Sequence, residues 1–581
     1  PRFIQGVAML SDLSLIDCES VASEGKLKYK QASVQIKEFT ETHFEFPDSI
    51  PDLSHLIRRV SCGQYKVKER LMLLHSFQEP IAIVLEFLHG RRLGIALPLA
   101  DEDIELLDDM DRLIWDMVRA YNMLVVETSD YSGFMQKANN TAMAHAIYRS
   151  IAYQTRRLLM SYEVYRPVRT GVWSEMHLLY RIARDKGLDK MPLPIEQQDG
   201  SKLTSTIEHI YKRAIMIGRS DPYHFSFRGV TKLFESLEEW PTDVRLDRKL
   251  GKARNDCMFI VDLSSDYPAA PYFSDISFTE DENHLVLDTS VLMKRLNREH
   301  KDVMQEIIEG LKGIAQIQAF ERMEILRHIM VSWGVHPIRK NERKDSNEDA
   351  NIVVGLANIY DILHPGYDAD MNEIDLDSTA ELQMIGGVFQ EKVGQERDAN
   401  QLIDIWKIGN ESAGGYSLYR YKQGKQQLRV GDLIALRKKP EDGWTICMVR
   451  WARAEKDDEV LAGLFKLGSK AVPMSIRPVE HDSDRIVEYT SGLIIPQNAS
   501  FSNCDLAISQ KTLYAPMKSL WIKQADKDRM VVASNLLTSS RSVDVFGYRY
   551  DLKDVQRTMS HKESRQYQEE NPLDMLRNKP S

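Results

Sequence analysis

The spacing of hydrophobic residues changes along the chain. Between residues 52 and 250, apolar residues recur three and four positions apart, a period that places them on one side of a helix. The clearest such stripe consists of Leu106, Met110, Leu113, Ile114, Met117 and Val118. Acidic residues at 101–103 precede it, where they favour the positive end of a helix dipole. The pattern predicts a helical bundle over residues 52–250.

The segments on either side of this bundle have other patterns. Residues 1–51 contain the alternating stretch "KLKYKQASVQIKEF" between loop signals, which predicts strands and loops. Residues 251–335 contain "CMFIVDL", typical of a buried strand, and then "HLVLDTSVLMKRLNREH", typical of a strand followed by a helix. These residues are expected to form a mixed α/β connecting region.

The last part of the chain has the pattern of short β-strands. Runs such as "DLIALRKK" and "WTICMVRWARAE" stand between Gly, Asp and Lys turns, which predicts a small antiparallel barrel within residues 336–480. Further runs predict an additional β region over 481–551. The fold class is therefore α+β multidomain: an N-terminal helical bundle, a mixed α/β middle, and a C-terminal antiparallel β-barrel with further strands.

Two segments lack the pattern of a packed core. Residues 364–400 begin with Pro-Gly and an acidic tract, and are predicted to be a flexible insertion in the barrel. Residues 552–581 are rich in charge and are predicted to be a disordered tail.

Composition limits the classes of function. The chain of 581 residues has 43% hydrophobic and 28% charged residues, as expected for several folding units. Its formal net charge of −10 argues against a general DNA or RNA binder, so any anion must be met by local charges. The longest apolar runs, such as "IAIVLEFL", are shorter than the roughly 20 residues of a spanning helix, and no membrane insertion is expected.

The cysteines indicate the compartment. They are five in number, widely scattered, and include no Cys-x-x-Cys: Cys18, Cys62, Cys257, Cys447 and Cys504. This pattern is typical of a reducing compartment without a zinc site, so we expect a cytoplasmic protein that uses no metal and no cofactor. The first residue is Pro1, so localisation is inferred from the visible residues alone.

Two short motifs bring together residues suited to binding an anion. Arg339 and Arg343 form Arg-x-x-x-Arg, and Asn410, Ser412 and Gly415 form Asn-x-Ser-x-x-Gly where the strand pattern begins. Arginine offers a fork for phosphate oxygens and a flat face for a purine, while asparagine offers both a carbonyl and an amide. A glycine there either takes a positive φ or lets the backbone approach the ligand without a Cβ in the way.

These motifs, in this order and followed by "LRVGDLIAL", "TICMVRWA" and "LAGLF", resemble the PilZ domain, a bacterial receptor for cyclic di-GMP. The resemblance covers roughly residues 336–480. It implies a β-barrel that binds this dianionic dinucleotide through the five motif residues. The chain departs from the family in spacing, because 67 positions separate Arg343 from Asn410 (410 − 343 = 67), and "NIVVGLANIYDILHPGYDADMNEIDLDS" lies between them. Loop-closure entropy grows only logarithmically, so such an insertion is compatible with a site.

The function expected on this basis is that of a non-enzymatic cyclic di-GMP effector. Its barrel would bind the dinucleotide and its helical region would carry an output or bind a protein partner that the sequence does not identify. An alternative is a degenerate PilZ-like scaffold that binds protein partners without nucleotide. A hydrolase hidden in the helical region is a third possibility, but the sequence has no Gly-x-Ser-x-Gly and no His-Glu-x-x-His to support it.

Overall fold

The chain is represented by a computed structural model that divides into two compact units. Unit 1 comprises Pro1–Asp302, Met323–Lys340 and Trp451–Leu461, and unit 2 comprises Val303–Arg322, Asn341–Arg450 and Ala462–Ser581. The structure describes residues 10–21, 27–41, 48–91, 96–129, 136–196, 202–226, 229–249, 257–272, 281, 283–309, 311, 313–334, 342–363, 402–420, 426–455, 459–479, 488–497, 504–511, 513–524, 527–540 and 542–550.

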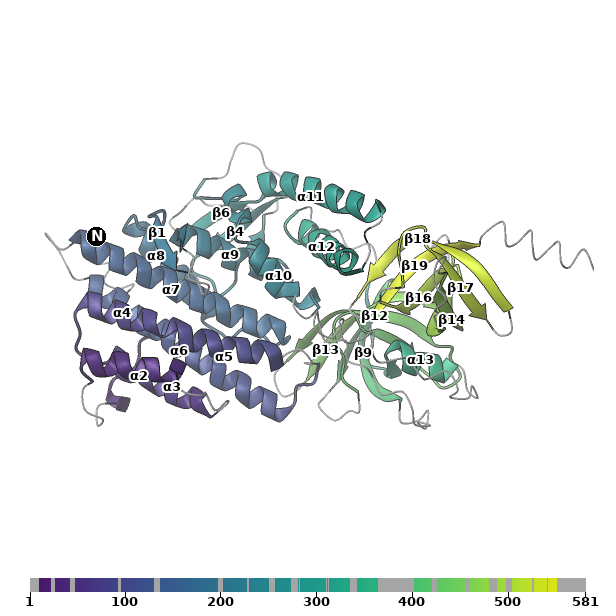
Figure 1. The fold of residues 1–581 in the computed structure, drawn as a ribbon, viewed down its shortest axis with the longest axis horizontal. Coiled ribbons are helices and arrows are strands. Elements are labelled where there is room, and N and C mark those ends of the chain that lie inside the picture. Colours follow the sequence, from purple (N-terminus) through teal and green to yellow (C-terminus); the bar gives the residue numbers. More distant parts are fainter. Residues whose placement is uncertain are drawn as a thin grey trace, which may run out of the picture. The chain divides into compact units, whose positions relative to one another are not determined.

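Unit 1 is built mainly from helices. They are η1 (Glu19–Val21), α2 (Tyr29–Glu41), α3 (Ser49–Ser61), α4 (Val67–Ser76), α5 (Gln78–Arg91), α6 (Asp101–Ser129), α7 (Gln136–Glu163), α8 (Val172–Asp185), α9 (Ile207–Arg219), η3 (Pro222–His224), α10 (Gly229–Ser236) and η4 (Trp240–Asp243). The long helices α6 and α7 lie side by side (Figure 1), and α3 packs on α6. A two-stranded antiparallel sheet, β1 (Leu193–Glu196) with β2 (Lys202–Ser205), precedes α9.

The predicted apolar stripe is confirmed. All six of its members, from Leu106 to Val118, are buried in α6, because a period of 3.6 residues turns them toward the neighbouring helices. Among the described residues, no helix is both long and apolar enough to span a bilayer.

The strands predicted near the N-terminus are wrong. Residues 29–41 form the helix α2, in which Ala32 and Ile36 are buried while Val34 is 57% exposed. A strand would place these three side chains on the same face, whereas a helix places residues four apart together and turns the residue between them away. The stretch "KLKYKQASVQIKEF" fits both the period of a strand and that of a helix, and the buried side chains follow the helical period.

The cysteines also differ from the expectation of reduced thiols. Cys18, which precedes η1, forms a disulfide with Cys62 at the end of α3, and their Cα atoms are 5.5 Å apart. Cys257, Cys447 and Cys504 form no disulfide. The two paired cysteines are 44 positions apart, so their spacing gave no signal of the contact.

The predicted mixed α/β region contains a small antiparallel sheet with strand order β3-β6-β4-β5. Its strands are β3 (Arg245–Asp247), β4 (Met258–Asp262), β5 (Ala270–Pro271) and β6 (His284–Asp288). Helices α11 (Ser290–Ile308) and α12 (Gly313–Ser332) follow, and both run from one unit into the other.

A first barrel follows in unit 2. Its strands are β7 (Lys344–Asp345), β8 (Asp349–Val354), β9 (Asp404–Ser412), β10 (Gly415–Arg420), β11 (Leu433–Arg437), β12 (Thr445–Ala454) and β13 (Val460–Ser469). They are ordered β10-β13-β12-β11-β8-β9-β7, and β10 also pairs with β9, which closes six of them into a ring. The segment between the two motifs begins with regular structure: it forms β8 and then the helix α13 (Leu356–Leu363).

A second, closed barrel follows at once (Figure 1). It consists of β14 (Val472–Pro478), β15 (Thr490–Ile495), β16 (Leu506–Gln510), β17 (Ser519–Gln524), β18 (Lys527–Ser539) and β19 (Val543–Tyr550). Their order is β14-β15-β16-β19-β18-β17. Counted from β8 and from β14, the two rings have the same order, 1-2-3-6-5-4. The second barrel therefore repeats the topology of the first.

The boundary predicted at residue 480 is wrong. β14 pairs with β15 and β17, so residues 472–478 belong to the second barrel and not to the first. One apolar core continues through both barrels, because Leu433 and Ile446 of the first lie in the same buried cluster as Leu493 and Ile508 of the second. The predicted insertion at 364–400 and the tail at 552–581 lie outside the described residues.

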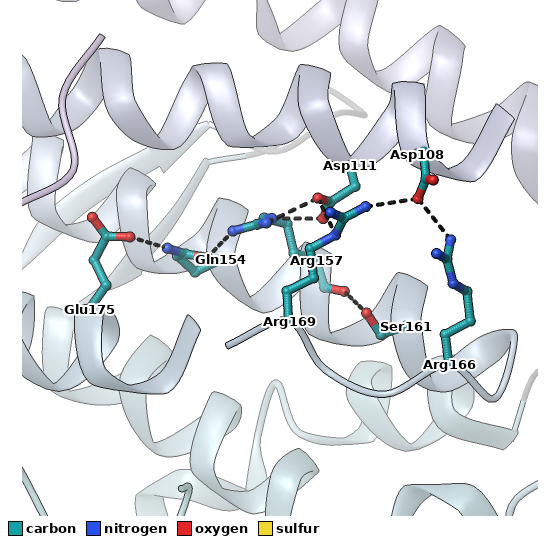
Figure 2. Close-up of polar contacts among 8 residues, drawn as sticks. All are labelled: Asp108, Asp111, Gln154, Arg157, Ser161, Arg166, Arg169 and Glu175. Carbon is teal, nitrogen blue, oxygen red and sulfur yellow. Dashed lines mark hydrogen bonds and ion pairs between the residues drawn. The ribbon is translucent and has the colours of Figure 1, made fainter. Parts of the chain in front are cut away.

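Unit 1 also contains a row of charged and polar side chains, most of them buried or half-buried (Figure 2). Arg157 of α7 donates to both carboxylate oxygens of Asp111 on α6 at 2.8 and 3.0 Å, and Arg169, in the loop after α7, contacts Asp111 at 2.9 Å. Arg166 of the same loop pairs with Asp108. These contacts tie the loop between α7 and α8 to α6.

The row ends at a buried carboxylate. Gln154 donates to Glu175 of α8 at 2.7 Å, and Asn122 does so at 2.8 Å. Burial raises the pKa of the Glu175 carboxyl, and the hydrogen bonds that it accepts act in the opposite direction. Because its polar neighbours satisfy it, this carboxylate is a structural element of the bundle.

Candidate functional site

The Asn-x-Ser-x-x-Gly motif forms the turn that joins β9 to β10. Asn410 and Ser412 lie in the last three residues of β9, and Gly415 begins β10. Ser412 pairs with Gly415 across the hairpin, and Asn410 pairs with Ser417. The side chains of Asn410 and Ser412 are half-buried. The motif thus occupies the end of a hairpin at the rim of the first barrel.

The strand β7 brings Arg343, the second arginine of its motif, to this turn. Lys344 pairs with Glu411, and Asp345 pairs with Asn410, in an antiparallel register. Arg343 directly precedes Lys344, so it enters the sheet at the level of Ser412, and it is exposed. Arg343 is therefore close in space to the Asn-x-Ser-x-x-Gly motif although it is far from it in sequence.

Polar contacts fix the segment that follows Arg343 against the barrel. The Lys438 ammonium contacts Glu348 at 3.0 Å and Glu411 at 2.6 Å, so one cation joins the entry segment to the motif. The hydrogen bond from Lys438 holds the pKa of the Glu411 carboxyl below its usual value. Lys407 contacts Asp349 at 3.0 Å in the same region.

The packing of the barrel requires a glycine at position 415. The φ angle of Gly415 is not positive, so its backbone conformation does not call for glycine. A Cβ on Gly415 would lie 1.9 Å from the carbonyl oxygen of Leu464 on β13, an impossible distance. The close approach observed here is to the backbone of β13 and not to a ligand, so it is a reason for glycine that the sequence did not suggest.

A lysine on β13 also contacts the turn. The backbone N–H of Lys466 donates to the Gly414 carbonyl at 3.0 Å, and its ammonium donates to the Ser412 carbonyl at 3.0 Å. The ammonium also lies 4.0 Å from the centroid of the Tyr416 ring, a cation–π contact. Burial lowers the pKa of Lys466, and burial raises the pKa of Tyr416 to about 12.

The structure places four of the five predicted site residues together. Arg343, Asn410, Ser412 and Gly415 meet at the β7–β9–β10 edge, while Arg339 lies outside the described residues. Sequence reasoning missed Lys438 and Lys466, which both contact the motif. The signal for Lys466 was a lysine inside the otherwise apolar strand "LAGLFKLG". In the described part of the chain, no group of His, Cys, Asp and Glu side chains could hold a metal ion.

Two models of protein families match the chain. Residues 45–250 match the N-terminal domain of "Cyclic-di-GMP receptor FimW", and residues 364–473 match its "middle PilZ domain". The second match contains Asn410, Ser412 and Gly415, and begins after Arg343.

The chain is also similar to one curated protein over nearly its whole length. It is 21% identical over 570 residues to the "Cyclic-di-GMP receptor FimW" of Pseudomonas aeruginosa strain PAO1, covering 91% of this chain and 90% of that protein. Residues 364–473 therefore carry a PilZ domain, and residues 45–250 are similar to the N-terminal domain of the receptor FimW.

Proposed function

We propose that this protein is a receptor for cyclic di-GMP and binds it at the turn between β9 and β10. The observation that carries this proposal is the register of β7, which sets Arg343 beside Ser412. Arg339, Arg343, Asn410, Ser412 and Gly415 are the proposed binding residues. The name of the Pseudomonas relative and that of the matching PilZ model support the same ligand.

The chemistry of the turn suits a dianion that carries guanine bases. Arg343 is exposed and can pair with a phosphate or stack on a base, while the Asn410 amide can both donate to and accept from a guanine edge. The lysines at 344, 438 and 466 all lower the pKa of Glu411, so the turn stands in a locally positive field. A chain of net charge −10 can attract a dianion only through such a local concentration of cations.

We also propose that ligand binding is coupled to the helical region. The strands β12 and β13 of the first barrel end in a hairpin whose tip, Trp451–Leu461, belongs to unit 1. In that unit the Ala454 N–H donates to the Tyr165 carbonyl at 2.8 Å, in the loop between α7 and α8. The middle of β13 lies against the motif turn at Leu464 and Lys466. A change at the turn could therefore pass along β13 to this hairpin and its hydrogen bond with the loop between α7 and α8.

The proposed receptor is non-enzymatic and acts in the cytoplasm, where its output is passed to a protein partner. In that reducing compartment Cys18 and Cys62 would be two thiols and not a disulfide.

Calorimetric titration of the full chain with cyclic di-GMP tests the proposal. Cyclic di-AMP and GTP serve as controls, because they share phosphates with the ligand but differ in bases or in shape. We expect saturable binding of cyclic di-GMP alone. Absence of binding would favour the alternative, a PilZ-like scaffold that recognises protein partners without nucleotide.

A further inference from the structure

Lys466 differs from the other lysines near the motif in how it is held. It is half-buried on β13, and its ammonium reaches across β10 to the carbonyl of Ser412. A lysine normally keeps its ammonium in water, and placing this one against a backbone carbonyl and a ring costs side-chain entropy and hydration. The contact therefore needs a reason beyond filling the barrel wall.

The contact acts on the part of the motif that would face the ligand. The peptide group of Ser412 joins the last residue of β9 to the two-residue turn at 413–414. A donor on its carbonyl restricts rotation about that peptide, and so limits the directions in which Ser412 and Asn410 present their side chains. The backbone of Lys466 adds a second restraint through Gly414.

We propose that Lys466 is a positioning residue of the cyclic di-GMP site, whose ammonium holds the Ser412 carbonyl and thereby fixes the turn that presents Asn410 and Ser412. This inference rests on the function proposed above. It assigns a role to a residue that lies outside both sequence motifs, 51 positions after Gly415 (466 − 415 = 51).

The charged and titratable groups around Lys466 fix the sign of its pH dependence. Glu411 of β9 faces it, as do Cys447 of β12 and Lys438 after β11, in addition to Tyr416 of β10. Burial is the largest effect and lowers the pKa of Lys466 below 10.5. As the pH rises through this lowered pKa, the ammonium loses its charge and its hold on the Ser412 carbonyl weakens. Affinity for the dianion then falls.

The test compares three variants of the full chain. Lys466→Met roughly keeps the length of the side chain but removes its charge and donors, whereas Lys466→Arg keeps the charge. The control, Lys523→Met, removes an equal charge from a half-buried lysine on β17 of the second barrel. We expect Lys466→Met to bind cyclic di-GMP about tenfold more weakly, Lys523→Met to bind as the parent does, and Lys466→Arg to recover most of the loss. Thermal unfolding confirms that each variant folds.

Two further readouts separate positioning from a general effect of charge. Amide exchange over residues 409–418 should be faster in Lys466→Met than in the parent without ligand, because the turn has lost a restraint. The affinity of the parent divided by that of Lys466→Arg should fall at alkaline pH, because lysine loses its charge there and arginine does not. Titration of the ligand affects both proteins equally and cancels in this ratio.

The outcomes distinguish this inference from the proposed function. If the parent chain does not bind cyclic di-GMP, the proposed function is overturned and this inference with it. If the parent binds and Lys466→Met binds equally well, the inference alone is overturned. Equal weakening by Lys523→Met, or unchanged exchange of the turn in Lys466→Met, also refutes a positioning role.

Discussion

Replacing Gly415 by alanine should destabilise the first barrel, whether or not ligand is present. The new Cβ would lie 1.9 Å from the Leu464 oxygen, about 1.5 Å closer than the 3.4 Å at which ordinary contact begins. The atom that it meets belongs to the backbone, so no side-chain rotation relieves the overlap. β10 and β13 must separate, and the hydrogen bond from the Lys466 N–H to the Gly414 carbonyl is strained or lost.

The size of the effect can be estimated from these two terms. Overpacking in a tight site costs about 1–3 kcal/mol, and a lost backbone hydrogen bond costs about 1 kcal/mol more. The expected loss in the free energy of unfolding is therefore about 2–4 kcal/mol. With a urea m-value of about 2 kcal/mol/M, the midpoint of the transition of unit 2 should fall by about 1–2 M.

Two other glycines of the same barrel are matched controls. A Cβ on Gly443 would meet nothing within 4 Å, and a Cβ on Gly409, only one residue from the motif, would meet Tyr419 at an ordinary 3.5 Å. Gly443→Ala and Gly409→Ala should unfold at nearly the parent's urea concentration. If Gly415→Ala also unfolds with the parent, the close approach of β13 is not what requires a glycine there.

Three further predictions concern the ligand. Arg343→Ala should weaken cyclic di-GMP binding by more than about tenfold without changing the melting temperature, since a charge-assisted contact is worth about 1.5–3 kcal/mol; equal affinity by calorimetry would remove this arginine from the site. Deleting residues 368–396 and joining the ends with a short flexible linker should leave the barrel folded and binding within a few-fold, because loop length costs little entropy; loss of the barrel's urea transition would show that the segment contributes to the core. Ligand should slow amide exchange over residues 334–346 and alter it in part of the helical region, and protection limited to the barrel would contradict coupling.

The sequence predicted the elements whose period was unambiguous. The stripe of α6 extends over several turns, and strands such as β12 have turn signals on both sides, so their local patterns sufficed. β8 was missed because "DANIVV" contains only a short apolar run and is separated from the helical "LANIYDIL" by a single residue, Gly355. Periodicity alone does not separate a short strand from the start of a helix.

Features that depend on the pairing of distant strands could not be predicted. The contacts of Lys466 require β13 to lie beside β10, which follows from the order of the ring and not from any local pattern. The repeated topology of the two barrels likewise appears only when the strand orders are compared. The sequence also placed β14 in the first barrel, because nothing in the local pattern of β13 or β14 marks the barrel to which each strand belongs.

The order of the strands explains why a long spacer between the motifs does not separate them. The chain leaves the sheet after β8 and returns at β9, and these two strands pair with each other from Asp349↔Lys407 to Ile352↔Asp404. Whatever lies between them closes a loop at the far end of that ladder, whereas β7 and the motif turn lie at its other end. Each doubling of the loop costs only about 0.6 kcal/mol, less than the roughly 1 kcal/mol that one backbone hydrogen bond contributes. The ladder therefore outweighs the added loop entropy, and the position of Arg343 beside Ser412 is set by the register of β7 and β9 and not by the number of residues between them.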